Sequence, residues 1–198
     1  RAGADVVWDQ CHLFQSGTYH GTYTVDGVER TVDGWIGQRD HSWGIRDHAR
    51  CPLWIWWQIQ LEDGFLGIWH WELSNGARIY TDGCWAGADG SDPVPAIDFR
   101  YDARWVGADG GDAEYGEHGD DVAGLEATCE IVLADGRRIA IEATGTFARP
   151  YEPFRRGGLN LMTVRTDDGR EGTVTYEVTG ARHHHFFPAT TVEGVLPS

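Results

Sequence analysis

The sequence contains no lysine. All 16 of its basic residues are arginine, and 31 acidic residues give a formal net charge of −15. A surface of this sign repels nucleic-acid phosphates and anionic membranes, so neither is an expected partner. No apolar run approaches the roughly 20 residues of a membrane-spanning helix, so no membrane insertion is expected. The chain also lacks a Gly-rich phosphate loop and a G-x-S-x-G nucleophile motif, which leaves no sign of a nucleotide-binding or serine-hydrolase site.

Cysteine is scarce. The four cysteines are widely spaced and form no C-x-x-C motif; they are Cys11, Cys51, Cys84 and Cys129. Their low density, with an N-terminus that has no apolar signal-peptide core, favours free thiols and a cytoplasmic protein.

Asp-Gly pairs recur along the whole chain and are its dominant local signal. Such pairs tolerate the positive φ angles of tight hairpin turns, and the runs between them are rich in strand-forming residues. No segment shows a sustained apolar period of 3.6 residues, so we expect no helix. The first hairpin is predicted over 18–25 and 28–32, followed by a second turn at 33–34.

Further strands are expected at 53–61, 65–73, 77–81, 97–105, 124–133, 138–147, 159–165 and 172–180. Closing nine or ten such strands removes exposed sheet edges. The sequence therefore predicts one all-β domain over residues 1–198, an antiparallel up-and-down, lipocalin-like β-barrel, with a β-sandwich as the alternative. Strand 53–61 is apolar on both faces, which suits a barrel wall that is covered outside and lines a cavity inside.

Residues 33–47 combine charge, imidazole and indole more densely than any other stretch. A buried strand does not normally carry Arg39, Asp40 and His41 unless these groups are paired or functional. We expect this segment to enter the barrel and to supply its polar chemistry.

Residues 32–47 (VDGWIGQRDHSWGIRD) resemble the signature of the tandem-lipocalin superfamily that includes carotenoid hydratase (hydroxyneurosporene synthase) and related natural-product cyclases. The pattern from His12 to Gly27 and the run at 67–71 (GIWHW) are similar as well, so the resemblance covers roughly residues 10–85. It implies a lipocalin-like barrel, an apolar substrate, and hydration, dehydration or cyclisation without a metal or organic cofactor. Members usually carry two barrels, so a second barrel domain or a homodimer is an open alternative.

Alkene hydration or cyclisation begins with a proton delivered to carbon, which a desolvated carboxylic acid can supply. In this interpretation Asp40 is the proton donor, and His41 or His70 is its partner. Arg39 and Arg46 set the electrostatics of Asp40. Equally favoured is a structural ion-pair network of Arg39, Asp40, Arg46 and Asp47. Neighbouring residues on a strand face opposite ways, so Asp40 and His41 share a face only at a bulge.

Ten tryptophans are many for 198 residues, and their density between 54 and 71 favours a ring-lined cavity, although a packed core would use the same residues. The predicted substrate-contacting residues are Trp35, Trp43, Arg46, Trp54, Trp56, Gln58, Trp69 and Trp71. Parity puts Trp69 and Trp71 on one face of their strand, and His70 and Glu72 on the other. We expect the tryptophans to face the interior and the His70–Glu72 pair to face outward, with an acid–base role for His70 as the alternative.

The run 183–185 is three consecutive histidines. His183 and His185 could share a metal with His12, His20 or His70, but no second cluster has ligand spacing, so no metal is expected. The acidic stretch 109–121 lacks EF-hand spacing and indicates a solvated loop.

The function that these patterns favour is that of a cofactor-independent lyase or isomerase. Its substrate would be a hydrophobic unsaturated terpenoid, polyene or polyketide bound in the barrel. A barrel that carries a lipid or pigment without catalysis is the alternative from another class, and a His-ligated metalloenzyme is a lesser one.

Overall fold

The computed structural model describes residues 5–6, 8–46, 53–73, 76–113, 122–146, 159–179, 183–184 and 187–188. Within these ranges the regular secondary structure consists of β-strands, and no helix occurs. None of these residues therefore belongs to a helix long and apolar enough to cross a membrane.

Ten strands of eight residues or more make up the fold, and two short ones follow near the C-terminus. They are β1 (Trp8–Val25), β2 (Val28–Arg46), β3 (Leu53–Leu61), β4 (Gly64–Glu72), β5 (Arg78–Gly87), β6 (Val94–Val106), β7 (Gly124–Leu133), β8 (Arg138–Thr146), β9 (Leu159–Thr166), β10 (Glu171–Thr179), β11 (His183–His184) and β12 (Phe187–Pro188).

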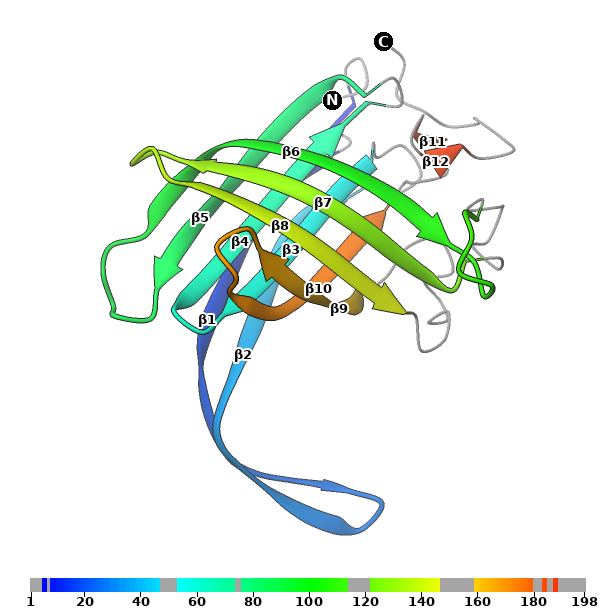
Figure 1. Cartoon of the computed structure of the whole chain (residues 1–198). Helices are drawn as coiled ribbons and strands as arrows, with labels where there is room; N and C mark the ends of the chain where they lie inside the picture. The colour runs from blue at the N-terminus through cyan, green and yellow to red at the C-terminus, as the bar shows by residue number, and fades with distance from the viewer. Residues whose placement is uncertain are drawn as a thin grey trace.

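Strands β3 to β10 close into one antiparallel barrel (Figure 1). Their order is β10-β3-β4-β5-β6-β7-β8-β9, so each strand pairs with its neighbour in sequence and β10 returns to β3. Asp-Gly turns join several of these strands, with glycine at positive φ, as at Gly136 (91°) and Gly169 (89°). The prediction of an all-β, up-and-down barrel is confirmed.

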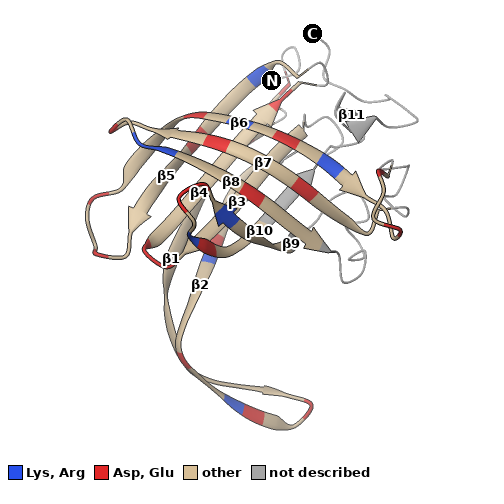
Figure 2. Ribbon diagram, in the orientation of Figure 1, with Lys and Arg blue, Asp and Glu red and all other residues tan. Residues whose placement is uncertain are grey.

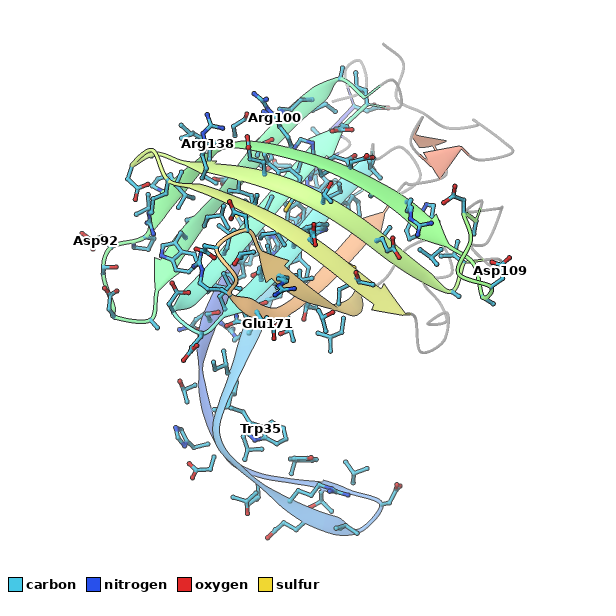
Figure 3. All side chains as sticks on the ribbon, in the orientation of Figure 1. Trp35, Asp92, Arg100, Asp109, Arg138 and Glu171 are labelled. Atoms are coloured by element: carbon cyan, nitrogen blue, oxygen red, sulfur yellow. The ribbon has the colours of Figure 1, made fainter. Side chains whose placement is uncertain are left out.

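Strands β1 and β2 form a separate two-stranded sheet. The prediction that residues 33–47 enter the barrel is wrong. The eight later strands satisfy one another's edges, so the barrel closes without this hairpin, which lies against its outer surface. Figure 1 shows the tip of the hairpin running well beyond the barrel, and the labelled Trp35 in Figure 3 belongs to this projecting part.

The predicted turn at residues 33–34 is a β-bulge instead. Strand β2 runs unbroken through these residues, with His20 opposite Asp33 and Tyr19 opposite Trp35. Gly34 is the extra residue, and its φ of 69° is one that glycine adopts without strain. Asp-Gly provides this backbone angle in a hairpin turn and in a bulge alike, so the sequence signal was right about the angle and wrong about the element.

Among the described residues, one apolar cluster lies in the barrel interior. Alternate residues of β3 (Leu53, Ile55, Trp57, Ile59 and Leu61) belong to it together with buried side chains from across the barrel, among them Phe99, Ile131, Ile139, Met162 and Val174. These β3 side chains therefore point inward.

The other face of β3 carries Trp54 and Trp56, which form a second cluster with Trp8 of the hairpin and with Trp69 and Trp71 of β4. Strand β3 is buried on both faces for this reason, as its sequence predicted. The hairpin is the outer cover.

Figure 2 shows charged residues on the loops and along several strands. Several form exposed pairs across neighbouring strands, such as Arg104 with Glu126 at 2.8 Å and Arg138 with Glu130 at 2.9 Å. Exposed pairs of this kind contribute little to stability, so the fold rests mainly on the apolar interior.

Candidate functional site

A groove of about 550 Å³ lies on the outside of the barrel, between the hairpin and strands β4 and β5. On the hairpin side it is lined by Trp8, Asp9, Gln10, His12 and Phe14. On the barrel side it is lined by Trp69, Trp71, Ile79, Tyr80 and Asp82. Its size and its mixture of aromatic walls with a few polar groups are typical of small-molecule sites.

A histidine–carboxylate pair borders this groove. His12 Nε2 is hydrogen-bonded to Oδ2 of Asp40, and the His12 side chain is 14% exposed against 41% for Asp40. His12 lines the groove and Asp40 does not. The imidazole is therefore the group that can meet a ligand, while the carboxylate orients the ring.

The bulge at Gly34 decides which residue His12 meets. Between the hairpin tip and the bulge, paired residues run as Val25 with Val28 and His20 with Asp33. Continued without a bulge, that register would set His12 opposite His41. The extra residue sets His12 opposite Ser42, so that Asp40 shares the inward face of the hairpin.

Aromatic rings hold the hairpin on the barrel. Trp8 contacts Trp54 and Trp71 with ring centroids 5.1 and 5.0 Å apart, and His12 meets Trp69 edge-on at 4.3 Å. Phe14 lies over Gly67 of β4, where a Cβ atom would overlap its ring. Glycine at position 67 therefore allows the close approach of β1. The contacts of β1 with the barrel also hold the His12 imidazole among indole rings.

The far wall of the groove carries a phenol and a carboxylate. The Tyr80 hydroxyl donates to Oδ2 of Asp82 at 2.9 Å, and Asp82 also accepts the backbone N–H of Gly83. Partial burial, reinforced by the Asp82 charge, raises the pKa of Tyr80 above its usual value, so this phenol stays protonated near neutrality. Asp82 therefore gives this wall of the groove a negative charge.

A second histidine–carboxylate pair lies inside the barrel. His70, which is 1% exposed, binds Oε1 of Glu72 through Nε2 at 2.7 Å and Oγ1 of Thr81 through Nδ1 at 2.7 Å. The Tyr101 hydroxyl donates to Oε2 of Glu72 at 3.1 Å. Burial first, and then the Glu72 charge, raise the pKa of Tyr101 well above its ordinary value.

The predicted orientation of β4 is thus wrong. Trp69 and Trp71 face outward into the groove, and His70 and Glu72 face inward. Parity was correct, but the hairpin covers the outer face, so the larger aromatic set finds burial there. The interior accepts His70 and Glu72 because Thr81 and Tyr101 complete their hydrogen bonds.

The other predicted site residues divide between two places. Trp54, Trp56 and Gln58 lie with Trp69 and Trp71 on the face that the hairpin covers. His41 and Trp43 lie on the opposite face of β2, with their rings 5.1 Å apart and Trp43 51% exposed. Neither His41 nor His70 bonds to Asp40 among the described residues, so the predicted partner of Asp40 is replaced by His12.

Three further predicted residues are remote from the groove or only partly described. Arg39 is exposed on β2. Trp35, 53% exposed, contacts Tyr23 near the hairpin tip with ring centroids 5.9 Å apart. Arg46 ends β2, but its side chain lies outside the described residues, as does Asp47. Their roles stay predictions.

His12 is the residue that sequence reasoning assigned no acid–base role. It precedes Asp40 by 28 positions. The sequence held one signal for this pair, the long hairpin. Counting pairs of residues outward from the turn at residues 26–27 sets His12 opposite the neighbour of Asp40 in the sequence. The bulge shifts the pairing by one residue and so brings Asp40 onto the same face as His12.

The metal alternative finds no set of ligands in the described part of the chain, where no three His, Cys, Asp or Glu residues cluster suitably. His183 and His184 form the short strand β11, while His185 lies outside the described residues. Cys11, Cys84 and Cys129 are free thiols, and Cys51 lies outside them as well. Burial, and then the Asp82 charge, raise the pKa of the Cys84 thiol.

A family model described as a domain of unknown function (DUF7064) matches residues 5–182. The chain belongs to this family. Among solved structures, it is similar to kievitone hydratase from Nectria haematococca, with a TM-score of 0.49 and 12% identity over 86% of this chain. The match covers 52% of that protein, so the chain spans about half its length. No curated protein matches the sequence.

Proposed function

We propose that this DUF7064 domain is a cofactor-independent lyase or isomerase that hydrates, dehydrates or cyclises a hydrophobic unsaturated molecule bound in the hairpin groove. The observation that carries the proposal is the His12–Asp40 pair at the wall of an aromatic groove. The motif that contains Asp40 resembles that of carotenoid hydratases, which supports the same class of reaction. The groove replaces the barrel interior as the expected location of the substrate.

In this proposal His12 is the catalytic acid and base, and Asp40 is its positioning residue. In the dehydration direction the imidazolium of His12 gives its proton to the hydroxyl oxygen, the C–O bond breaks, and one molecule of water leaves behind a carbocation. The imidazole then takes a proton from the neighbouring carbon, so that the double bond forms and the imidazolium is restored. Hydration is the reverse. Positive charge that develops on the substrate is stabilised by the faces of Trp69 and Trp71 and by the carboxylate of Asp82.

The carrier alternative shares the groove and differs only in chemistry. It predicts that ligands bind in the same groove and leave unchanged. A requirement for a second barrel, supplied by a longer chain or by a second copy, stays a proposal beside the main one.

The test uses paired neutral probes, linalool with myrcene and 2′-hydroxychalcone with flavanone, which differ by one water or by one ring closure. Conversion is followed by liquid chromatography with mass spectrometry. We expect His12→Gln to lower turnover about a hundredfold or more, because general acid–base catalysis contributes about that much. The matched control is His20→Gln, which removes an exposed His–Asp pair at the hairpin tip. Binding without conversion of any pair would favour the carrier.

A further inference from the structure

Exposed apolar side chains are concentrated on the hairpin. Among the described residues, thirteen large hydrophobic side chains are exposed, and nine of them belong to β1 and β2. Eight of these nine lie on one face of the hairpin; they are Leu13, Tyr19, Tyr23, Val25, Val28, Trp35, Trp43 and Ile45. An apolar surface that is exposed over such a length marks a site of interaction with another molecule.

These eight residues lie on the face of the hairpin that points away from the barrel, which we call the outer face. Side chains alternate along a strand, and the rings of Trp8, His12 and Phe14 contact the barrel from even-numbered positions of β1. The odd-numbered positions of β1 and their partners on β2 therefore form the outer face. Apart from Ile36, the opposite face of the hairpin tip is polar, and its threonines are Thr18, Thr22, Thr24 and Thr31.

The outer face also differs from the rest of the chain in charge. Its paired residues include Arg30 and Arg39 and one acidic residue, Asp9, whereas the whole chain has a net charge of −15. The carboxylates of Glu29 and Asp33 lie on the opposite face of the hairpin. Two copies of so acidic a chain repel each other over most of their surface. At the outer face they can approach without opposing carboxylates.

The order of residues along the outer face suits pairing of this face with itself. Nine residue pairs of the hairpin lie on it, and the pair of Gly17 with Gly37 is the fifth from either end. A twofold axis through this central pair stacks two hairpins antiparallel, with each barrel on the far side of its own hairpin. A Cβ atom added at Gly17 meets no other atom within 4 Å, so the centre of the face leaves room for close approach.

In this arrangement each arginine of the outer face meets an aromatic ring. Arg39 lies one pair from the centre toward the barrel and Trp35 one pair toward the tip, so Arg39 faces the partner subunit's Trp35. Arg30 and Trp43 each lie three pairs from the centre, on opposite sides, and face each other in the same way. A guanidinium group over an indole is attractive, so the rings offset the positive charge of the face.

The size of the outer face meets what a stable interface needs. Strand β1 has 18 residues. At about 3.3 Å per residue the hairpin is about 60 Å long, and its two strands are about 10 Å wide, so the face covers about 600 Å² in each copy. Two copies together would bury about 1,200 Å², which is the lower limit for stable protein interfaces.

We infer that the outer face is a dimer interface, in which two copies of this chain stack their hairpins antiparallel about Gly17 and Gly37. The hairpin then lies between two barrels and is covered on both faces near its base. The inference is independent of the proposed function, because His12 faces the barrel and the outer face does not. A different protein on the same face is the competing occupant.

Sedimentation equilibrium of the full 198-residue chain tests the interface. We expect the wild type to be a dimer at micromolar concentration. Trp43→Ser removes a large ring from both halves of the interface and should raise the dissociation constant at least about thirtyfold, as truncation of a buried aromatic anchor does. The matched control is Ile36→Ser, which removes an exposed apolar side chain from the other face and should leave the constant unchanged.

Charged variants at residue 17 test the twofold axis. Gly17→Glu places two carboxylates across the axis and Gly17→Arg two guanidinium groups, so each variant alone should be monomeric. An equal mixture of the two should form a heterodimer, because the opposite charges then meet. Gly17 is not among the glycines at positive φ, so either side chain fits its backbone. Thr18→Glu and Thr18→Arg, on the opposite face, are the controls and should dimerise like the wild type.

Three outcomes would overturn the inference. A wild-type chain that stays monomeric at every concentration would leave the outer face to a different protein. A dimer that persists in Trp43→Ser and Gly17→Glu would place the contact elsewhere. Monomers that fail to pair when the two Gly17 variants are mixed would exclude an axis at this residue. None of these results bears on turnover in the groove, which His12→Gln tests separately.

Discussion

The molecule contains two histidine–carboxylate pairs in opposite environments. His70 and Glu72 lie inside the barrel, where Thr81 and Tyr101 complete the hydrogen bonds of both. His12 and Asp40 lie outside it, at the wall of a groove, with Asp40 partly open to solvent. The inner pair is a closed network, and the outer pair borders open space.

The role of a polar pair therefore depends on its surroundings as well as on its residue types. A buried pair with every partner in place specifies and stabilises an interior, and breaking it leaves an uncompensated charge. A pair beside a groove contributes less to stability and has room to act on a ligand. We therefore assign a role in stability to His70 and a role in chemistry to His12, and four variants test this division.

The largest expected effect is on stability and comes from His70→Ala. Removing the imidazole leaves the Glu72 carboxylate inside the barrel without the His70 hydrogen bond. We expect the free energy of unfolding to fall by about 3–5 kcal/mol, measured by urea denaturation. His20→Ala, in an exposed pair, is the control and should change stability by less than about 1 kcal/mol. If both variants lowered the free energy of unfolding equally, the buried pair would have no special role in stability.

The second effect separates activity from stability. His12→Gln should lower turnover of a convertible probe about a hundredfold, while the free energy of unfolding changes by about 1 kcal/mol or less. His41→Gln, on the other face of β2, should keep wild-type turnover. Steady-state kinetics and urea denaturation on the same preparations check both statements. If His41→Gln lost the activity and His12→Gln kept it, the hairpin would present its other face to the substrate.

The third variant separates His12 from Asp40 while leaving both residues in the sequence. Deleting Gly34 removes the bulge and shifts the register by one residue, so His41 replaces Asp40 on the inward face. We expect turnover to fall at least about tenfold. The unfolding of the barrel should change little, because its described strands share no backbone pairing with the hairpin. Gly34→Ala keeps the residue count and should retain the pair, despite a strain of about 1–2 kcal/mol at positive φ. Full activity of the deletion variant would contradict the role of the bulge.

The smallest effect concerns Tyr101 and pH. Its pKa is raised in the folded protein, so the hydroxyl's contribution is present below the unfolded pKa of about 10 and is lost as pH rises above that value. Tyr101→Phe should cost about 1.5 kcal/mol at neutral pH. It should also flatten the alkaline fall in the free energy of unfolding, measured by urea denaturation from neutral to alkaline pH. If the free energy of unfolding fell with alkaline pH as steeply in the variant as in the wild type, Tyr101 would not be the cause of that fall.

The architecture was predictable because local hairpins carried it. Asp-Gly turns between apolar runs fixed most strand boundaries to within a few residues, as for the strand expected at 124–133 and found at β7. Closure followed from the need to pair edges. What could not be predicted was that β1 and β2 stand outside, because their alternation is equally compatible with a barrel strand.

The site was less predictable, for two physical reasons. Both faces of β3 and β4 are buried, so parity separated Trp69 from His70 without saying which faced inward. The Asp33–Gly34 signal fitted a turn and a bulge equally, and the choice moves Asp40 from one face of the hairpin to the other. His12 could be found only after both choices were made.

The most direct test of a ligand site in the hairpin groove follows the histidine ring signals by heteronuclear NMR while a neutral aromatic probe, 2-naphthol, is added. We predict that the His12 ring signals shift progressively with ligand, and that the signals of the exposed His20 ring and the buried His70 ring stay unchanged. A shift of the His70 ring with His12 unmoved would place the ligand inside the barrel and contradict the assignment of chemistry to the hairpin groove.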